Sequence, residues 1–358
     1  MKQEICVSAP GKIIILGEHA VVYGKLAIIA AIDKRCYVQV NGRKDRKIKI
    51  FSNNFKKEIL TDFEIINIKF NKAQKDWKAY KQKNDIELLK SITSAPLDYS
   101  QIVIGEFINY FFSDIAYNGF DLIINSEIPI GSGMGSSAAL AVSIIGALFL
   151  YVNKPLDKEK INEIAFLAEQ KKHGFPSGGD NTTCCHGGLL WFHKEAADLK
   201  IFSQIHFTIS PNITNKFLII FTGQPMESTG ELVSVVRNLY QERPEYVSGL
   251  FEAQERLVRE LLTALKNEDE EKIITIIKNG EKNLERLGVV SFIVKSLIRK
   301  IEKKGGAAKI CGAGGIAKGS GMLLAYHKDP KVVQRLLGEN KYDFSTVTLG
   351  TEGVRIEP

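Results

Sequence analysis

The chain has 358 residues, of which 44% are hydrophobic and 25% are charged. This length predicts two domains, and the composition is that of a folded globular protein, not of a disordered or fibrous one. The 48 basic side chains exceed the 41 acidic ones, but many of the lysines are mixed with acids, as in residues 72–85. A nucleic-acid track would combine arginines with interleaved aromatic residues, so the charge pattern argues against nucleic acid and suits a small anionic substrate.

Cysteine usage and hydropathy bear on the environment of the protein. The five cysteines, at positions 6, 36, 184, 185 and 311, form no CxxC pair. A chain of this length needs no disulfide framework, so we expect a reducing cytosol. The first 12 residues have no apolar signal core, and no run of about 18 apolar residues follows. The sequence therefore predicts a cytoplasmic protein with no membrane partner.

The first half of the chain mixes strands and helices. Residues 1–40 contain short β-like runs separated by turns with Gly and Pro, and residues 41–99, rich in Lys and Asn, are predicted to be a surface region with weak strands and some mobile loop. Residues 101–116 have helical spacing, and 120–129 read as a strand. Residues 138–152 are apolar almost all round, which predicts a buried helix.

The second half changes character. An amphipathic helix is predicted over 161–174, and strands follow at 187–193 and 216–222. Beyond residue 228 the chain has four helical segments, then a strand, a glycine turn, a strand and a last helix. The change near residue 210 predicts an N-terminal domain over 1–208 and a C-terminal domain over 209–358.

A glycine-rich loop carries the clearest chemical signal. The stretch PIGSGMGSSAAL, residues 129–140, places a glycine at every second position ahead of two serines and a helix. Free backbone N–H groups and the positive end of a helix dipole bind phosphate there without a side-chain cation. The loop lacks the lysine of the common GxxxxGK[ST] pattern. It is predicted to hold the phosphates of a nucleotide; the alternative is an ordinary loop with serine caps.

A candidate for the missing cation lies near the N-terminus. In APGKIIILGEHAVVYG, residues 9–24, Lys12 precedes an apolar run, and Glu18 and His19 follow a glycine. One such residue alone is more often structural than catalytic. Three polar residues that interrupt an apolar segment flanked by glycines favour a functional role.

A third polar segment is EQKKHGFPSGGDN, residues 169–181. Asp180 is predicted to lie on a turn, where its carboxylate either accepts a proton from a hydroxyl nucleophile or caps the next segment. Glu169 lies on the preceding helix, where it either reaches a metal ion or pairs with a neighbouring lysine.

Taken together, these motifs resemble the GHMP kinase superfamily, and the wording of GEHAVVYG and HGFPSGGDN is most similar to its mevalonate kinase branch. TGQPMESTGELV, LERLGVV and KICGAGG, at 222–233, 284–290 and 309–315, fit as well. The resemblance covers nearly the whole chain and is weakest over 41–100. It implies an α+β two-domain GHMP kinase fold, with an N-terminal domain like domain 2 of ribosomal protein S5, a ferredoxin-like α/β C-terminal domain, and a cleft between them.

The resemblance also implies an activity, the transfer of the γ-phosphoryl group of ATP to the primary hydroxyl of mevalonate in isoprenoid biosynthesis, with Mg²⁺ as cofactor. In the family pattern Asp180 matches the general base, and Lys12 matches a lysine near the transferred group. The implied ATP-binding residues are Ser126, Gly131, Ser132, Gly133, Met134, Gly135, Ser136 and Ser137. The implied substrate-binding residues are Glu18, His19, Ser177 and Thr222. The implied Mg²⁺ ligands are Ser137 and Glu169.

Departures from the family pattern bear on the acceptor more than on the reaction class. Gly-Gly-Asp replaces the commoner Gly-Ile-Asp or Gly-Val-Asp at Asp180, and IAKGSG follows the GAGG turn. The nearest alternative is another small-molecule kinase such as a phosphomevalonate kinase, whose substrate needs extra cations; Lys171 or Lys172 are candidates. A nucleotide sensor without catalysis is disfavoured because the three candidate catalytic and metal residues are all present. The sequence leaves a homodimer open and offers only a guess, Asn53, for the adenine pocket.

Overall fold

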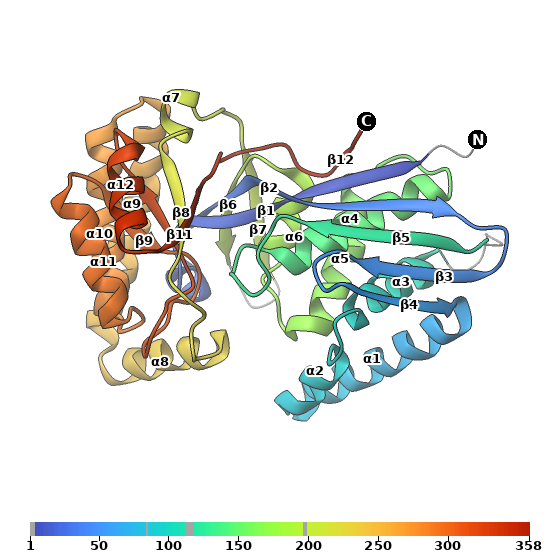
Figure 1. Cartoon of the computed structure of the whole chain (residues 1–358). Helices are drawn as coiled ribbons and strands as arrows, with labels where there is room; N and C mark the ends of the chain where they lie inside the picture. Colours follow the sequence, from blue (N-terminus) through green and yellow to red (C-terminus); the bar gives the residue numbers. More distant parts are fainter. Residues whose placement is uncertain (1–3, 84, 112–117, 196–198) are drawn as a thin grey trace.

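Two sheets, each covered by helices, lie side by side, and the C-terminal end of the chain lies beside the larger sheet (Figure 1). The computed structural model describes residues 4–83, 85–111, 118–195 and 199–358. Within these ranges no helix combines the length and the hydropathy needed to cross a lipid bilayer.

The larger sheet has eight strands in the order β12-β1-β2-β5-β3-β4, with β6 paired to β2 and β7 paired to β6. The strands are β1 (Ile5–Leu16), β2 (Ala27–Gly42), β3 (Lys47–Ser52), β4 (Lys57–Asp62), β5 (Phe120–Ser126), β6 (Leu189–Lys194), β7 (Lys200–Ile205) and β12 (Arg355–Ile356). The sequence predicts separate short runs near the N-terminus, but β1 is one strand whose register to β2 shifts between Pro10 and Gly11. Pro10 lies opposite Arg35 and Gly11 opposite Ile32, so the extra residues of this irregularity, 33 and 34, belong to β2, and Lys12 follows it on β1.

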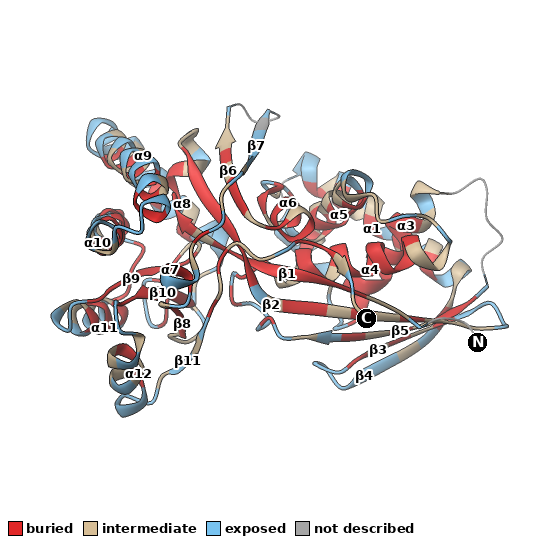
Figure 2. Cartoon of the chain, turned by 90° about the horizontal axis from the view of Figure 1, so that it is seen from above, coloured by how far each residue is buried: buried red, intermediate tan, exposed pale blue. Residues whose placement is uncertain are grey.

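Six helices accompany the larger sheet. They are α1 (Phe63–Lys83), α2 (Ile86–Ile92), α3 (Asp98–Tyr110), α4 (Ser136–Tyr151), α5 (Lys158–His173) and α6 (Gly179–His186). The prediction of a buried helix at 138–152 is confirmed, because α4 packs on β1 and β2 and is covered by α3 and α5 (Figure 2). The predicted helix at 101–116 is confirmed as α3 up to Tyr110, and residues 112–117 lie outside the described residues.

The prediction for residues 41–99 is wrong in part. This region forms two strands and two helices, including the 21-residue helix α1. Helix α1 is polar on average, yet its buried residues recur at intervals of four and three. They are Ile66, Phe70, Ala73, Trp77 and Tyr80. This spacing forms one apolar stripe on a helix, and the many lysines around it hide the pattern from a reading based on composition.

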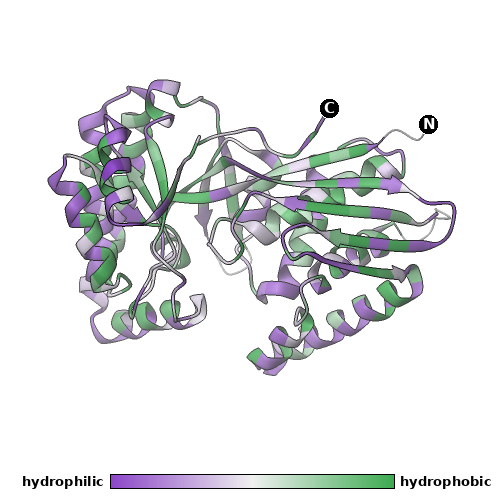
Figure 3. Ribbon diagram, viewed as in Figure 1, coloured by the Kyte–Doolittle hydropathy of each residue, from purple (hydrophilic) through white to green (hydrophobic). Residues whose placement is uncertain are grey.

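The smaller sheet has four antiparallel strands in the order β11-β8-β10-β9. They are β8 (Phe217–Phe221), β9 (Ala307–Ile310), β10 (Met322–Tyr326) and β11 (Asp343–Thr346). The helices of this half are α7 (Pro211–Thr214), α8 (Thr229–Glu242), α9 (Pro244–Lys266), α10 (Glu270–Arg286), α11 (Phe292–Lys303) and α12 (Pro330–Glu339). The four predicted helices beyond residue 228 are confirmed as α8 to α11, and their polar faces lie outside (Figure 3). The boundary at 208/209 falls between the two sheets and stays a prediction.

One apolar cluster joins the two halves. It contains residues of the larger sheet together with one face of the smaller sheet, such as Phe217 and Ile219 of β8. Leu218 and Ile220, on the opposite face of β8, belong to a second cluster with α11 and α12. Because successive residues of a strand face opposite sides, the smaller sheet buries both faces and one of them supports the junction with the larger sheet.

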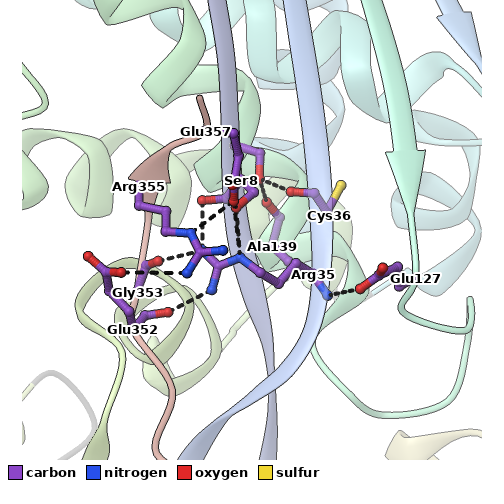
Figure 4. Close-up of polar contacts among 10 residues, drawn as sticks. Ser8, Arg35, Cys36, Glu127, Ala139, Glu352, Gly353, Arg355 and Glu357 are labelled. Atoms are coloured by element: carbon purple, nitrogen blue, oxygen red, sulfur yellow. Dashed lines mark hydrogen bonds and ion pairs between the residues drawn. The ribbon is translucent and has the colours of Figure 1, made fainter.

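The C-terminal strand β12 returns to the larger sheet and is fixed there by Arg35 (Figure 4). The guanidinium of Arg35 donates to the backbone oxygens of Ser8, Glu352 and Gly353 at 3.1, 2.8 and 2.7 Å, and to the hydroxyl of Ser8 at 2.7 Å. Arg35 is buried, so water cannot replace these bonds.

We expect Arg35→Met to lower the free energy of unfolding by about 3–5 kcal/mol, since it leaves buried acceptors without donors. The measurement is a denaturant titration of both proteins. Arg43→Met is the control, because Arg43 makes ion pairs with Asp45 and Asp121 at a more exposed position, where solvent screens such pairs and their loss should cost far less stability. Equal losses in the two variants would contradict the role given to Arg35.

Candidate active site

A cleft of about 1400 Å³ lies between the two halves of the molecule. Its first wall contains the glycine loop, the end of β1 and residues 172–181. Its second wall contains the start of α8 and the turn 311–314 that follows β9. Residues of α2 and α8 line its open side, and Figure 1 shows these two helices facing each other. The cleft is large enough to hold a nucleotide together with a small second substrate.

The glycine loop connects β5 to the N-terminus of α4. Gly131, Gly133 and Gly135 have φ values of 73°, 76° and 71°, which side chains rarely adopt. Gly135 occupies the N-cap position of α4, and no side chain caps the helix there. The N–H groups of the first turn have no partners within the helix, so this turn is suited to bind an anion.

Lys12 lies against this loop from the neighbouring strand. Its backbone N–H donates to the carbonyl of Met134 at 2.9 Å, and its side chain passes over Gly135. A Cβ atom added at Gly135 would lie 2.8 Å from Cγ of Lys12. The glycine therefore makes room for the lysine, and a cation reaches the helix N-terminus although the loop itself contains none.

We expect Gly135→Ala to displace Lys12 and to lower kcat/KM by at least about 10²-fold, the scale of a reacting group misplaced by about 1 Å. The measurement is steady-state kinetics of the purified variant. Gly288→Ala is the matched control, since Gly288 has a φ of 80° and nothing within 4 Å of the added Cβ. Both variants carry the backbone strain, but only the first carries the clash, so equal activity in the two would contradict this account.

Lys12 and Asp180 form the central ion pair of the cleft. Nζ of Lys12 lies 3.0 Å from Oδ1 of Asp180. Lys12 is buried, and burial favours its neutral form, but the Asp180 carboxylate outweighs this effect and raises the pKa of Lys12. Asp180 is the second residue of α6. The prediction that it lies on a turn is therefore wrong, because the helix already begins at Gly179. Its side chain is 38% exposed and can contact a ligand.

Glu169 is buried at the bottom of the same site. The hydroxyl of Tyr99 donates to its Oε1, and the hydroxyl of Ser137 donates to its Oε2 at 3.2 Å. Nε2 of His173 lies 3.1 Å from the Ser137 hydroxyl. Burial raises the pKa of Glu169, and the donors around it oppose this shift.

Among the residues that the structure describes, no lysine lies within 4 Å of the Glu169 carboxylate, whose charged neighbour at 3.6 Å is the side chain of His173. Lys171 instead forms a buried ion pair with Glu106 at 2.6 Å. A hydroxyl and a carboxylate 3.2 Å apart fit Mg²⁺, which takes few ligands from the protein and the rest from phosphates and water. Among the described residues no group of three or more His, Cys, Asp or Glu side chains is arranged to hold a metal ion.

Glu18 and His19 are both held by the second half of the molecule. Lys309, from β9, donates to Oε1 of Glu18, and both side chains are fully buried. Nε2 of His19 lies 3.0 Å from the carbonyl oxygen of Ala313. His19 has a φ of 56°, a strained value for a residue with a side chain, and such strain is frequent at functional sites.

Most of the predicted site residues come together in this cleft. Those that line it are Lys12, Glu18, His19, Ser126, Gly131, Ser132, Gly133, Gly135, Ser136, Ser137, Glu169, Ser177 and Asp180. Met134 and Thr222 do not line it. Met134 is buried beneath the loop, and Thr222 binds the backbone of Ser320 and Gly321.

Several residues of the cleft were not predicted. Asn54, rather than Asn53, lines the wall and bonds to the backbone of Ser126 in both directions, at 2.7 and 2.8 Å. Tyr99 has no local sequence signal, since it lies 70 residues before Glu169. Lys309, which binds Glu18 but does not itself line the cleft, has a local signal, because it is a charged residue inside the apolar strand AAKI.

Comparisons with known proteins agree with this site. Residues 101–188, which include the glycine loop and Asp180, match the family model of the GHMP kinases N terminal domain. Mevalonate kinase from Pyrococcus horikoshii is 31% identical over 321 residues, 88% of this chain and 87% of that protein. Mevalonate kinase from Thermococcus onnurineus is 32% identical over 360 residues, 99% of this chain and 98% of that protein.

A solved structure confirms the predicted fold. The crystal structure of the Methanococcus jannaschii mevalonate kinase matches 98% of this chain and 99% of its own, with a TM-score of 0.79 and 23% identity. The chain therefore belongs to the GHMP kinase superfamily, and it is a kinase that acts on an alcohol group.

Proposed function

We propose that this kinase transfers the γ-phosphoryl group of ATP to the primary hydroxyl of mevalonate, with Mg²⁺ as cofactor. Two observations support the substrate. The relatives at about 30% identity over most of the chain are named mevalonate kinases. The cleft also holds buried polar groups, Glu18 and His19, beside the Lys12–Asp180 pair, as a small hydroxylated acceptor requires.

Asp180 acts as the general base in this proposal. Its partly exposed carboxylate accepts the proton of the acceptor hydroxyl as the oxygen attacks phosphorus. Lys12, whose Nζ lies 3.0 Å from Oδ1 of Asp180, orients this carboxylate through their ion pair. No covalent enzyme intermediate is needed, because the alcohol attacks in line while the bond between the γ-phosphorus and the bridging oxygen breaks and ADP leaves.

The glycine loop and the start of α4 hold the phosphates through backbone N–H groups. The ammonium of Lys12 balances charge that develops on the transferred group. Ser137 and Glu169 would hold Mg²⁺, which when bound neutralises charge on the β- and γ-phosphate oxygens. The other implied ATP-binding residues shape the loop, and Ser126 lies beside the nucleotide.

The observation that carries the proposal is the Lys12–Asp180 ion pair at the glycine loop. The test is a coupled assay of ADP release with mevalonate, phosphomevalonate, galactose or no acceptor. We expect release that depends on mevalonate. Release with galactose alone would overturn the proposed substrate, and no acceptor-dependent release with any of them would favour a nucleotide sensor.

A phosphomevalonate kinase is the second candidate, and Lys172 is the observation that favours it. Lys171 forms an ion pair with Glu106. Lys172, in contrast, lines the cleft and has no acidic partner within 4 Å among the described residues. It lies over the ring of Tyr99, 4.8 Å from the centroid. If phosphomevalonate is the substrate, Lys172→Met lowers turnover of this anion selectively; equal effects on both acceptors would remove Lys172 as a reason for this candidate.

A further inference from the structure

Tyr99 holds a place in the site that no motif predicts. Its hydroxyl donates to Oε1 of Glu169, while the hydroxyl of Ser137 donates to Oε2 at 3.2 Å. Each oxygen of the carboxylate thus has one donor, and the plane of the carboxylate is fixed between two helices, α3 and α4.

Tyr99 is itself fixed in position. It is the second residue of α3 and is buried. The preceding Asp98 accepts from the backbone N–H of Ala95 at 2.8 Å and pairs with Lys69 of α1, which anchors the start of the helix. About two turns further along, the Glu106–Lys171 pair fixes α3 to α5, the helix that carries Glu169.

The environment of Glu169 needs such a partner. Its side chain is 2% exposed, so water cannot orient it. A carboxylate that ligates a metal is commonly oriented by an outer hydrogen bond, and loss of that bond typically lowers metal affinity about 10- to 100-fold. Tyr99 makes this type of contact. Its hydroxyl has one proton, and it donates that proton to Glu169.

We propose that Tyr99 is a positioning residue that orients Glu169 for Mg²⁺ bound with the nucleotide. The inference rests on the Mg²⁺ site of the proposed function but not on the identity of the acceptor. In this inference Tyr99 acts through the carboxylate of Glu169, to which its hydroxyl donates, and not through the transferred group. The ligand concerned is a small divalent cation that prefers oxygen donors.

The test is Tyr99→Phe, which removes the hydroxyl and keeps the ring that lies beneath Lys172. Binding of Mn²⁺, followed by electron paramagnetic resonance with a non-hydrolysable ATP analogue present, should weaken about 10- to 100-fold. The Mg²⁺ concentration for half-maximal turnover should rise by the same factor, and saturating Mg²⁺ should restore most of kcat. A defect that is only structural would not be restored by the cation.

Tyr110→Phe is the matched control. Tyr110 also lies on α3, and its hydroxyl donates at 3.1 Å to Glu163 of α5, away from the cleft. The same substitution between the same two helices should leave cation affinity unchanged. Unchanged Mn²⁺ affinity in Tyr99→Phe, or an equal loss in Tyr110→Phe, would overturn the inference.

Failure of the proposed function and failure of the role of Tyr99 give different experimental results. If the wild-type protein binds Mn²⁺ with the nucleotide but does not phosphorylate mevalonate, the acceptor is wrong and the role of Tyr99 stands. If the wild-type protein binds no divalent cation with the nucleotide, the Mg²⁺ site and the role of Tyr99 fail together.

Discussion

Asp180→Asn is expected to lower kcat by about 10²- to 10⁴-fold, the usual contribution of a positioned acid or base. The substitution keeps the size of the side chain and removes its ability to accept the proton. The carboxylate is the partner of Lys12 at 3.0 Å and does not belong to the glycine loop, so binding of ATP should remain nearly intact. The measurements are kcat in the coupled assay and the Kd of ATP by calorimetry.

The control for this variant is Asp269→Asn. Asp269 caps α10 by accepting from the N–H of Lys272, far along the chain from the cleft, and asparagine caps a helix equally well. Its kcat should stay within about twofold, since surface substitutions change stability little. Normal turnover in Asp180→Asn would remove Asp180 from the mechanism.

Lys12→Met is expected to lower kcat by a similar factor, about 10²- to 10⁴-fold, for a different reason. The ammonium is buried between the loop and Asp180, where charge acts more strongly than in water. Its loss removes the cation that faces the transferred group. The Kd of ATP should also rise, which Asp180→Asn should not cause.

The two residues act as one unit, so their effects should not add. The double variant Lys12→Met/Asp180→Asn should be no worse than about threefold below the slower single variant, as occurs when one step needs both groups. Stopped-flow or steady-state kinetics of the three variants and the wild-type protein measure this. Fully multiplied losses would show that Lys12 and Asp180 act in separate steps.

The sequence predicts those parts of the fold whose signal is local. The apolar run of α4, the amphipathic helices α8 to α11 and the glycine loop ahead of Ser136 all carry their pattern within about 20 residues. Helix α1 escapes prediction from composition because five apolar residues among many lysines and acids suffice to bury one face. The register shift between β1 and β2 at Pro10 and Gly11 is not predicted either, because Gly and Pro also signal turns.

The site follows the same rule. Lys12, the glycines and Asp180 each stand in a distinctive local motif, so the sequence predicts them, although only the fold brings Lys12 within 3.0 Å of Asp180. Tyr99 and Lys309 contribute through single side chains that meet partners 70 and 291 residues away. A contact of this kind depends on tertiary packing: Tyr99 has no local signal, and the charge inside the apolar strand AAKI marks Lys309 without identifying its partner.

A crystal structure with a non-hydrolysable ATP analogue and mevalonate tests the central claim most directly. The account predicts that the terminal phosphate lies against the backbone N–H groups of residues 133–137 and within hydrogen-bond distance of Lys12. It also predicts the primary hydroxyl of mevalonate beside the carboxylate of Asp180. A nucleotide bound away from the glycine loop, or an acceptor hydroxyl out of reach of Asp180, would contradict the account.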